Sequence, residues 1–274
     1  MSLTIDGKPL NQLGLALLPG FQHPAAPPIR DYTVSIPGRP GAYYFGSDID
    51  PMEFNLPLII KPQENRFELA AAIRKMVAAF IDPHGKPKEV KMIYDYEPDK
   101  YYLVQYSGSL PIDRYFSLGK FELPLIAYNP HAYSLVTNDD ITWGSENITF
   151  ENMTYTYGHT GGGQVEKITS PKLYSVFVSG LVQNPIILVS GSGTDVVMSA
   201  NGKSFSLGTF NNTNWLIDGN TWTVLKNGSN GLSDYNKNYP QGDWLEFKQG
   251  NNTLSINGIG LNLTIQVKFR DKFI

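Results

Sequence analysis

Three acidic residues at alternate positions, Asp95, Glu97 and Asp99, form the first group in the sequence that could carry chemistry. Two facing carboxylates can serve as acid and base, or as acid and nucleophile, in glycoside hydrolysis. Alternate positions of a strand share one face, but Pro98 indicates a turn here and favours a solvated hairpin tip. Glycan hydrolysis therefore stays an alternative, which requires two carboxylates facing each other in a cleft.

Nucleophilic, metal and cofactor chemistry have less support. The chain has no cysteine, which excludes disulfides and thiolate sites. Its four histidines lie far apart and show no metal-ligand spacing. They are His23, His84, His131 and His159. The stretch Gly202-Lys203-Ser204 ends like a phosphate-binding loop, but Val197 stands where that motif requires glycine. We expect a protein that is not an enzyme and holds no cofactor or metal ion.

The tryptophans could bind a sugar, because an indole face can stack on the apolar side of a pyranose. All four lie in the second half of the chain, at Trp143, Trp215, Trp222 and Trp244. Strand alternation would turn part of this set inward, so we favour a role in a sandwich core. A carbohydrate-binding adhesion module is the main alternative, and exposed, coplanar tryptophans would support it.

Charge and hydropathy exclude several partners. The 22 basic and 25 acidic residues leave a formal charge of −3, which gives no broad attraction to nucleic acid or to an anionic membrane. The start of the sequence lacks the apolar core of a secretory signal, and no stretch approaches the roughly 18 apolar residues of a membrane span. We expect no membrane insertion and synthesis in a cytoplasm.

The elements that position these residues differ between the two halves. In the first half, residues 66–81 carry apolar side chains at spacings of three and four, with Asn65 and Glu68 as a capping box. Residues 91–96 and 101–106 read as two strands of a hairpin. Residues 121–127 predict another strand, and Ile5 followed by Asp6-Gly7 predicts a short strand and turn.

The second half is a series of strands separated by turn signals. Residues 196–200 and 203–207 flank Asn201-Gly202, and residues 215–217 and 221–224 flank a second turn at 218–220. Further turns are indicated by Asn-Gly pairs at 227–228 and 257–258. Many short strands at about 8–12-residue spacing predict an antiparallel sandwich or jelly roll, with almost no helix after Tyr133. A shift in composition near residues 133–140 predicts the domain boundary.

Residues 31–46 predict an arm. Tyr32, Val34 and Ile36 alternate like a strand, residues 37–41 read as a rigid turn, and three adjacent aromatic residues follow. These aromatic residues are Tyr43, Tyr44 and Phe45. An isolated two-stranded hairpin is marginal in water, so we expect the arm to gain its order on a partner surface, with Arg39 as an interprotomer contact. The alternative is an arm folded onto its own domain.

The first half resembles a known family, the distal tail proteins of siphophages that infect Gram-positive bacteria. The resemblance rests on segments in the family's order over about residues 1–134. These segments are residues 2–7, 36–41, 54–60, 101–106 and 121–134. Pro40 departs from the family, which often has an acidic residue at that place in the glycine turn.

The resemblance implies a mainly β protein without enzymatic activity. Residues 1–134 would form a ring-building, β-sandwich-like domain with one α-helix and β-hairpins, and residues 135–274 a galectin-like or carbohydrate-module-like antiparallel β-sandwich. Six copies would form a hub at the distal end of the virion tail, after synthesis in the host cytoplasm. The implied partners are the tail tube protein, a tail-tip fibre protein, and receptor-binding or baseplate proteins. DNA would only pass through the channel.

Overall fold

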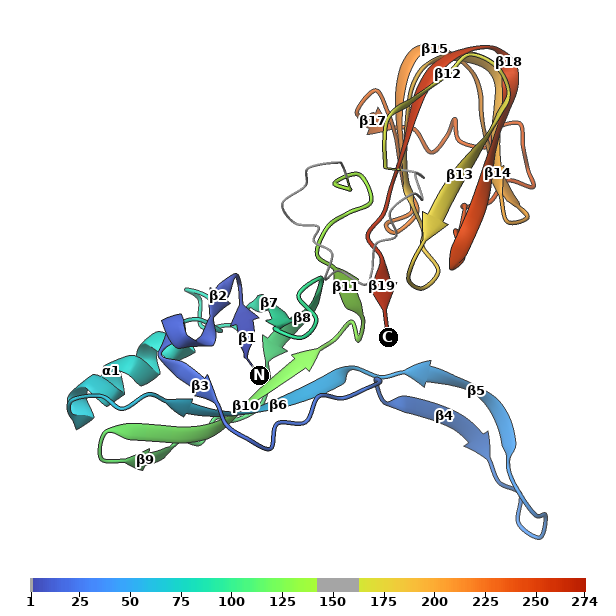
Figure 1. Ribbon diagram of the computed structural model, residues 1–274. Coiled ribbons are helices and arrows are strands. Elements are labelled where there is room, and N and C mark those ends of the chain that lie inside the picture. Colours follow the sequence, from blue (N-terminus) through green and yellow to red (C-terminus); the bar gives the residue numbers. More distant parts are fainter. Residues whose placement is uncertain (1, 142–162) are drawn as a thin grey trace. The chain divides into compact units, whose positions relative to one another are not determined.

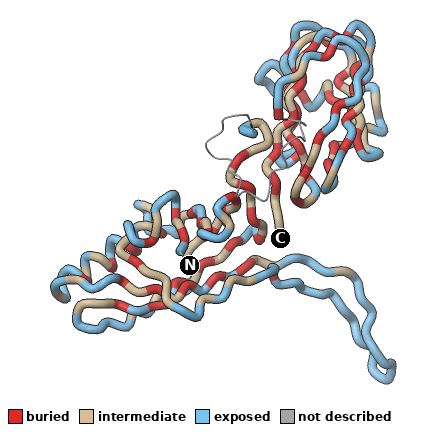
Figure 2. Tube along the Cα trace, viewed as in Figure 1, coloured by how far each residue is buried: buried red, intermediate tan, exposed pale blue. Residues whose placement is uncertain are grey.

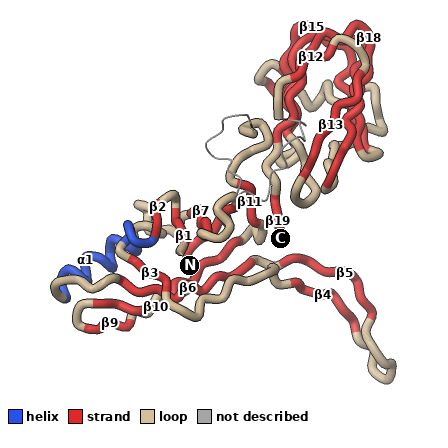
Figure 3. Tube along the Cα trace, viewed as in Figure 1, coloured by secondary structure: helices blue, strands red, loops and turns tan. Residues whose placement is uncertain are grey.

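The computed structural model describes residues 2–141 and 163–274 and divides into two compact units, Met1–Tyr133 with Ile274, and Ser134–Phe273. The chain is mainly β, as predicted. Among the described residues, α1 is the only α-helix, and no helix is long and apolar enough to cross a membrane (Figures 1 and 3).

The first unit is built on one antiparallel sheet with the strand order β2-β1-β7-β8-β10-β6-β3, and β9 extends it beside β10. A second, two-stranded sheet consists of β4 and β5 alone. The strands are β1 (Leu3–Ile5), β2 (Lys8–Pro9), β3 (Leu15–Leu17), β4 (Ile29–Val34), β5 (Tyr43–Ile49), β6 (Met52–Ile60), β7 (Glu89–Tyr94), β8 (Lys100–Tyr106), β9 (Asp113–Tyr115), β10 (Leu118–Ala127) and β11 (Ala132–Ser134). A 3-10 turn, η1 (Leu10–Leu13), precedes β3.

The centre of this sheet is the pairing of β6 with β10. The two strands run in continuous register from Met52 opposite Ala127 to Ile60 opposite Gly119, and their alternate side chains are buried. The predicted strand at 121–127 is confirmed and begins three residues earlier. The predicted hairpin at 91–106 is also confirmed, although β7 ends at Tyr94 and β8 begins at Lys100.

Helix α1 (Arg66–Val77) begins where the sequence predicted. The Asn65 side-chain oxygen accepts hydrogen bonds from the backbone N–H groups of Phe67 and Glu68, which satisfies two otherwise free donors. The Glu68 carboxylate accepts from the N–H of Glu64 rather than Asn65, so the capping box is displaced by one residue. Leu69, Ile73 and Met76 form the buried face. The helix ends at Val77, earlier than predicted, because the N–H groups of Ala79 and Phe80 donate to carbonyls three residues back instead of four.

The second unit is a curled antiparallel sheet of order β12-β18-β14-β15-β16-β17, with β13 also beside β18. Its strands are β12 (Glu166–Ile168), β13 (Lys172–Val178), β14 (Ile186–Ala200), β15 (Lys203–Asp218), β16 (Thr223–Lys226), β17 (Ser229–Asn230) and β18 (Gly250–Lys268). The short strand β19 (Lys272–Phe273) lies outside this sheet. The prediction of many short strands was wrong for the three longest, which have 15, 16 and 19 residues. They bend at irregularities in register instead of stopping.

The Asn-Gly signals explain this difference. The pair at 201–202 makes the predicted hairpin, with both residues at positive φ, and the pair at 227–228 does the same between β16 and β17. The pair at 257–258 lies inside β18, where the pairing with β14 shifts register, so it marks a bulge and not a turn. The bends let one sheet fold over a single apolar core that includes Met198, Phe205 and Phe247.

Candidate functional site

The structure forms the predicted hairpin arm, residues 29–49, from β4 and β5. At its tip, Pro37 precedes Gly38, whose φ is 80°, and the N–H of Arg39 donates to the Ile36 carbonyl at 3.1 Å. This is the signature of a type II turn, in which proline presets the second position and only glycine fits the third without strain. Pro40, the departure from the family pattern, follows directly after this turn and leaves it intact.

The root of the arm, where its two strands join the rest of the first unit, is held by contacts of Asp50 with Pro28 and Arg30. The N–H of Asp50 donates to the Pro28 carbonyl at 2.9 Å, and the Arg30 guanidinium forms an ion pair with the Asp50 carboxylate. This hydrogen-bonded pair raises the pKa of Arg30 and lowers the pKa of Asp50. Further out, the Tyr32 hydroxyl donates to Asp48 at 2.8 Å, and that hydrogen bond raises the pKa of Tyr32.

An aromatic cluster holds the chain that leads into the arm. Before β4, His23 packs 4.5 Å from the ring of Tyr94 and 5.6 Å from that of Tyr102, measured between ring centroids. Its Nδ1 lies 2.6 Å from the Tyr96 hydroxyl, and burial lowers its pKa, against the opposing effect of Glu97. Burial raises the pKa of Tyr102 to about 12. Sequence reasoning missed this cluster because its members lie on separate segments.

The arm beyond its root is exposed on both faces (Figure 2). Its apolar side chains are only partly shielded, and Phe45 is the most open at 71% exposure. The exposed apolar residues are Ile29, Tyr32, Val34, Ile36, Tyr43, Tyr44, Phe45 and Ile49. The arm therefore does not fold onto its own unit, which was the alternative, because both strands lie outside the main sheet. Monomeric proteins rarely expose apolar surface in this concentration unless it is a binding surface.

Pairing between the two strands sorts these side chains by face. Val34 lies opposite Tyr43, and Thr33 lies opposite Tyr44, so the two tyrosines project from opposite faces. The Arg39 guanidinium lies 4.6 Å from the centroid of the Tyr43 ring, in a cation-π contact. Arg39 thus stiffens the tip of its own arm. Its predicted contact with a neighbouring copy stays a prediction. Ile29 and Ile49, which the sequence analysis omitted, extend the apolar surface to the root.

The four tryptophans do not form one platform. Trp215 is 2% exposed and belongs to the core, and Trp143 lies outside the described residues. Trp222 is 58% exposed and lies in the turn before β16 with φ at 56°, so the predicted strand at 221–224 was wrong at its start. Trp222 meets the partly buried Trp244 at an interplanar angle of 84°, with 5.2 Å between centroids. Perpendicular rings do not offer the flat surface that the carbohydrate alternative requires.

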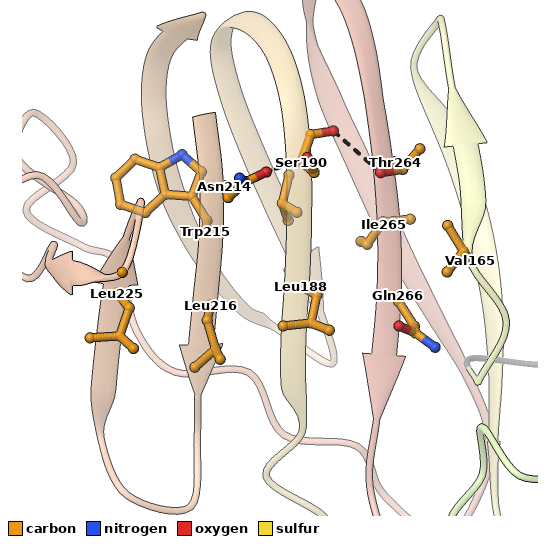
Figure 4. A pocket seen from close by; sticks show the side chains of 12 residues that line it. Val165, Leu188, Ser190, Asn214, Trp215, Leu216, Leu225, Thr264, Ile265 and Gln266 are labelled. Carbon is orange, nitrogen blue, oxygen red and sulfur yellow. Dashed lines mark hydrogen bonds between the residues drawn. The ribbon is translucent and has the colours of Figure 1, made fainter. Parts of the chain in front are cut away.

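The second unit has a hollow of about 320 Å³ on one face of its sheet (Figure 4). A row of side chains on adjacent strands lines it, with Leu225, Leu216 and Leu188 in register and Gln266 beside Leu188. Ser190, Asn214 and Thr264 add neutral polar groups. No ionisable side chain lines this hollow, so it presents neither an acid nor a base.

The acidic trio also lacks a catalytic arrangement. The Asp95 carboxylate accepts a hydrogen bond from the Ser2 N–H, and Glu97 forms an ion pair with Lys100 at 3.2 Å. Asp99 is buried, against the expectation of a solvated tip. The stretch Gly202-Lys203-Ser204 belongs to the hairpin between β14 and β15 and not to a phosphate-binding loop. Over residues 2–141 and 163–274, no three histidine, aspartate or glutamate side chains gather as a metal site would need.

A second exposed group was missed. At the turn between β9 and β10, Phe116 is 85% exposed and has φ of 32°, an uncommon conformation for a bulky residue. The neighbouring Ser117 carbonyl accepts from the N–H of Gln63 at 2.8 Å, which ties this turn to the segment before α1. Ser117 is a weak turn signal, and nothing in the sequence indicated a positive φ at Phe116, because glycine and asparagine are the residues that usually adopt it.

Comparisons with known proteins agree with this architecture. Residues 8–127 match the model of the phage tail protein RIFT-related domain family. A search of curated proteins gave no match. Among solved structures, the chain is similar to the Dit protein of SPP1, described as a paradigm of the hub adsorption apparatus in phages that infect Gram-positive bacteria. The two share 17% identity and a TM-score of 0.71, over 100% of this chain and 99% of that chain.

Chains of the phage P2 baseplate in its activated conformation also match, over 100% of this chain and 99% of those chains. For the baseplate structure with Ca, the identity is 12% and the TM-score is 0.39. For the structure with Sr, the identity is 10% and the TM-score is 0.39. The match to the family model over residues 8–127 and the fold shared with the SPP1 Dit protein confirm the expected resemblance to the distal tail proteins.

Proposed function

We propose that this chain is a structural, non-enzymatic protein of the phage tail, and that six copies form the distal hub between the tail tube and the tail tip. The observation that carries the proposal is the arm, residues 29–49, which is ordered by its own turn and root but exposes apolar side chains on both faces. A two-stranded ribbon of this kind is marginal in water alone. A second copy of the chain would cover it.

An arm makes a kind of contact that can build a ring. When an arm on one copy binds a different surface on the next, the contact is head-to-tail, and it closes into a ring when the rotation between neighbours divides a full turn evenly. The resemblance to the distal tail proteins makes six the expected number. A tail tube protein, a tail-tip fibre protein and receptor-binding or baseplate proteins would then bind the ring's ends and the second domain. We place the protein at the distal end of the virion tail after synthesis in the host cytoplasm.

The mild acidity of the chain suits a channel through which DNA passes. Basic groups lining a channel would bind phosphates and retain the DNA. The formal charge of −3 on each copy gives no such excess of basic groups.

The test is native mass spectrometry and light scattering over a range of concentrations, with the protein alone and with a tail-tip partner. We expect the wild type to form a ring of six and a chain lacking residues 37–46 to remain monomeric. A matched variant, Arg39→Ala, removes the cation-π contact at the tip and should weaken assembly without abolishing it. A wild type that stays monomeric under all these conditions would contradict the proposal, as would a ring that survives the deletion.

Within residues 2–141 and 163–274, the exposed Trp222 beside Trp244 is the one observation that favours the carbohydrate-binding alternative. A glycan array separates the two functions. Binding that disappears in Trp222→Ala, with an unchanged melting temperature, would support an adhesion module. We expect no such binding, because one ring stands perpendicular to the other.

A further inference from the structure

A long groove lies along α1 in the first unit. Two adjoining hollows, of about 280 and 840 Å³, share Ile73, Val77, Ile81 and Arg114 in their linings. We call the two hollows together the α1 groove. We infer that the α1 groove of one copy receives the arm of the next copy. This inference rests on the proposed function and names the surface that function requires.

The groove has the size and polarity to hold a strand. Its floor is apolar, with Met76 and Phe80 beside the shared residues. Helix α1 has 12 residues and is therefore about 18 Å long, and the six residues of β4 span about 20 Å. The arm could thus lie along the helix and bury its apolar side chains on this floor, which removes exposed area from both surfaces.

The charges of the two surfaces are opposite. Arg74 and Arg114 line the groove, and neither forms an ion pair with any described residue. Lys88 adds a third cation, already paired with Asp6, and Asp82 is the one acidic residue in the lining. The arm and its root carry three aspartates and two arginines between residues 29 and 50. Asp50 is paired with Arg30, but Asp48 accepts only a tyrosine hydroxyl and Asp31 has no described partner.

A copy cannot fill its own groove with its own arm. The arm joins β6 at Met52, and α1 follows the opposite end of β6, beyond Ile60. The nine residues of β6 hold these two ends about 30 Å apart, and the arm leads away from the helix (Figure 1). An arm and a groove at opposite ends of one unit are the two different surfaces that a head-to-tail ring needs.

Charge reversal tests the inference directly. Arg74→Glu with Arg114→Glu should abolish the ring at low ionic strength, where exposed charges are least screened. The charge reversal on the arm, Asp31→Lys with Asp48→Lys, should also abolish the ring at low ionic strength. A chain carrying all four substitutions restores opposite charges and should assemble again. Lys75→Glu with Lys61→Glu is the control, since it makes the same charge change on exposed residues outside the groove and should leave the ring intact.

Cross-linking provides a readout independent of charge. Since the chain has no cysteine, a pair introduced as Phe45→Cys and Ala78→Cys would be the only thiols present. A short bismaleimide should give a ladder of cross-linked multimers with this pair, and no ladder with Phe45→Cys and Lys8→Cys, since Lys8 is an exposed residue of β2 outside the groove. An equal ladder from both pairs would overturn the inference.

The outcomes separate this inference from the proposed function. If deleting residues 37–46 abolishes the ring but reversing the groove charges does not, the arm binds another surface and the inference is wrong. If the wild type never assembles, the proposed function fails, and the inference fails with it.

Discussion

Two tryptophans with similar sequence surroundings have different roles. Trp215 is buried in the second unit's core, whereas Trp222 is exposed in a turn. We expect Trp215→Ala to lower the free energy of unfolding by about 3–5 kcal/mol, because a large cavity replaces the indole. Trp222→Ala should cost less than about 1 kcal/mol, because no core packing is lost. Denaturant unfolding followed by circular dichroism measures both, and similar losses in the two variants would contradict the assignment.

His23 should make the first unit sensitive to acid. Burial lowers its pKa in the folded state below the unfolded value of 6.5. Below pH 6.5 the unfolded chain therefore binds a proton before the folded chain does, and stability falls as the pH falls through 6.5 towards the folded pKa. Well above pH 6.5, His23 is neutral in both states, and the stability of the folded unit is not reduced by its titration.

The matched variant is His23→Phe, which keeps an aromatic ring in the cluster and removes the titrating group. Thermal melts between pH 7.5 and pH 5 should show a smaller loss of stability in this variant than in the wild type. Parallel curves would show that His23 does not contribute to the pH dependence. The effects of carboxylates on the pH dependence of stability are the same in both proteins and cancel when the two curves are compared.

At the scale of single elements, the bends in the long strands decide the shape of the second unit. Gly191 lies at the start of the irregular region of β14 with φ at 137°, and a Cβ there would lie 2.3 Å from the Asn262 carbonyl oxygen. No side chain fits that space unless the backbone of β18 moves. The bend therefore depends on glycine at this position.

We expect Gly191→Ala to destabilise the second unit by more than about 2 kcal/mol, from backbone strain combined with the clash. Gly202→Ala is the control, because Gly202 also has positive φ but faces open space, and it should cost only about 1–2 kcal/mol. Chemical denaturation of both variants provides the measurement. Equal costs would mean that the close approach to β18 does not matter.

At the scale of the whole molecule, the arm and the α1 groove both lie in the first compact unit. We therefore propose that residues 1–133 hold everything that ring closure requires and that the second domain serves other partners. A chain truncated after Tyr133 should assemble into the same number of copies as the full chain. Native mass spectrometry of both proteins tests this, and a truncated chain that stays monomeric where the full chain assembles would show that the second domain takes part in the ring.

Features set by neighbouring residues could be predicted from the sequence. The start of α1 follows from Asn65 and from apolar spacing, and the Asn201-Gly202 hairpin follows from two residues that accept positive φ. The arm was also predictable, since alternating apolar residues flank a Pro-Gly turn. Each of these depends on contacts within a few residues, where sequence pattern and conformation are directly linked.

Features that depend on distant residues were decided only by the tertiary structure. The Asn-Gly pair at 257–258 has the same local signal as the pair at 201–202, but pairing of β18 with β14 keeps it inside a strand. The His23 cluster and the α1 groove each join segments far apart in the chain, and burial separates Trp215 from Trp222. Local preferences are worth about 1 kcal/mol or less per residue, and packing that buries whole side chains outweighs them.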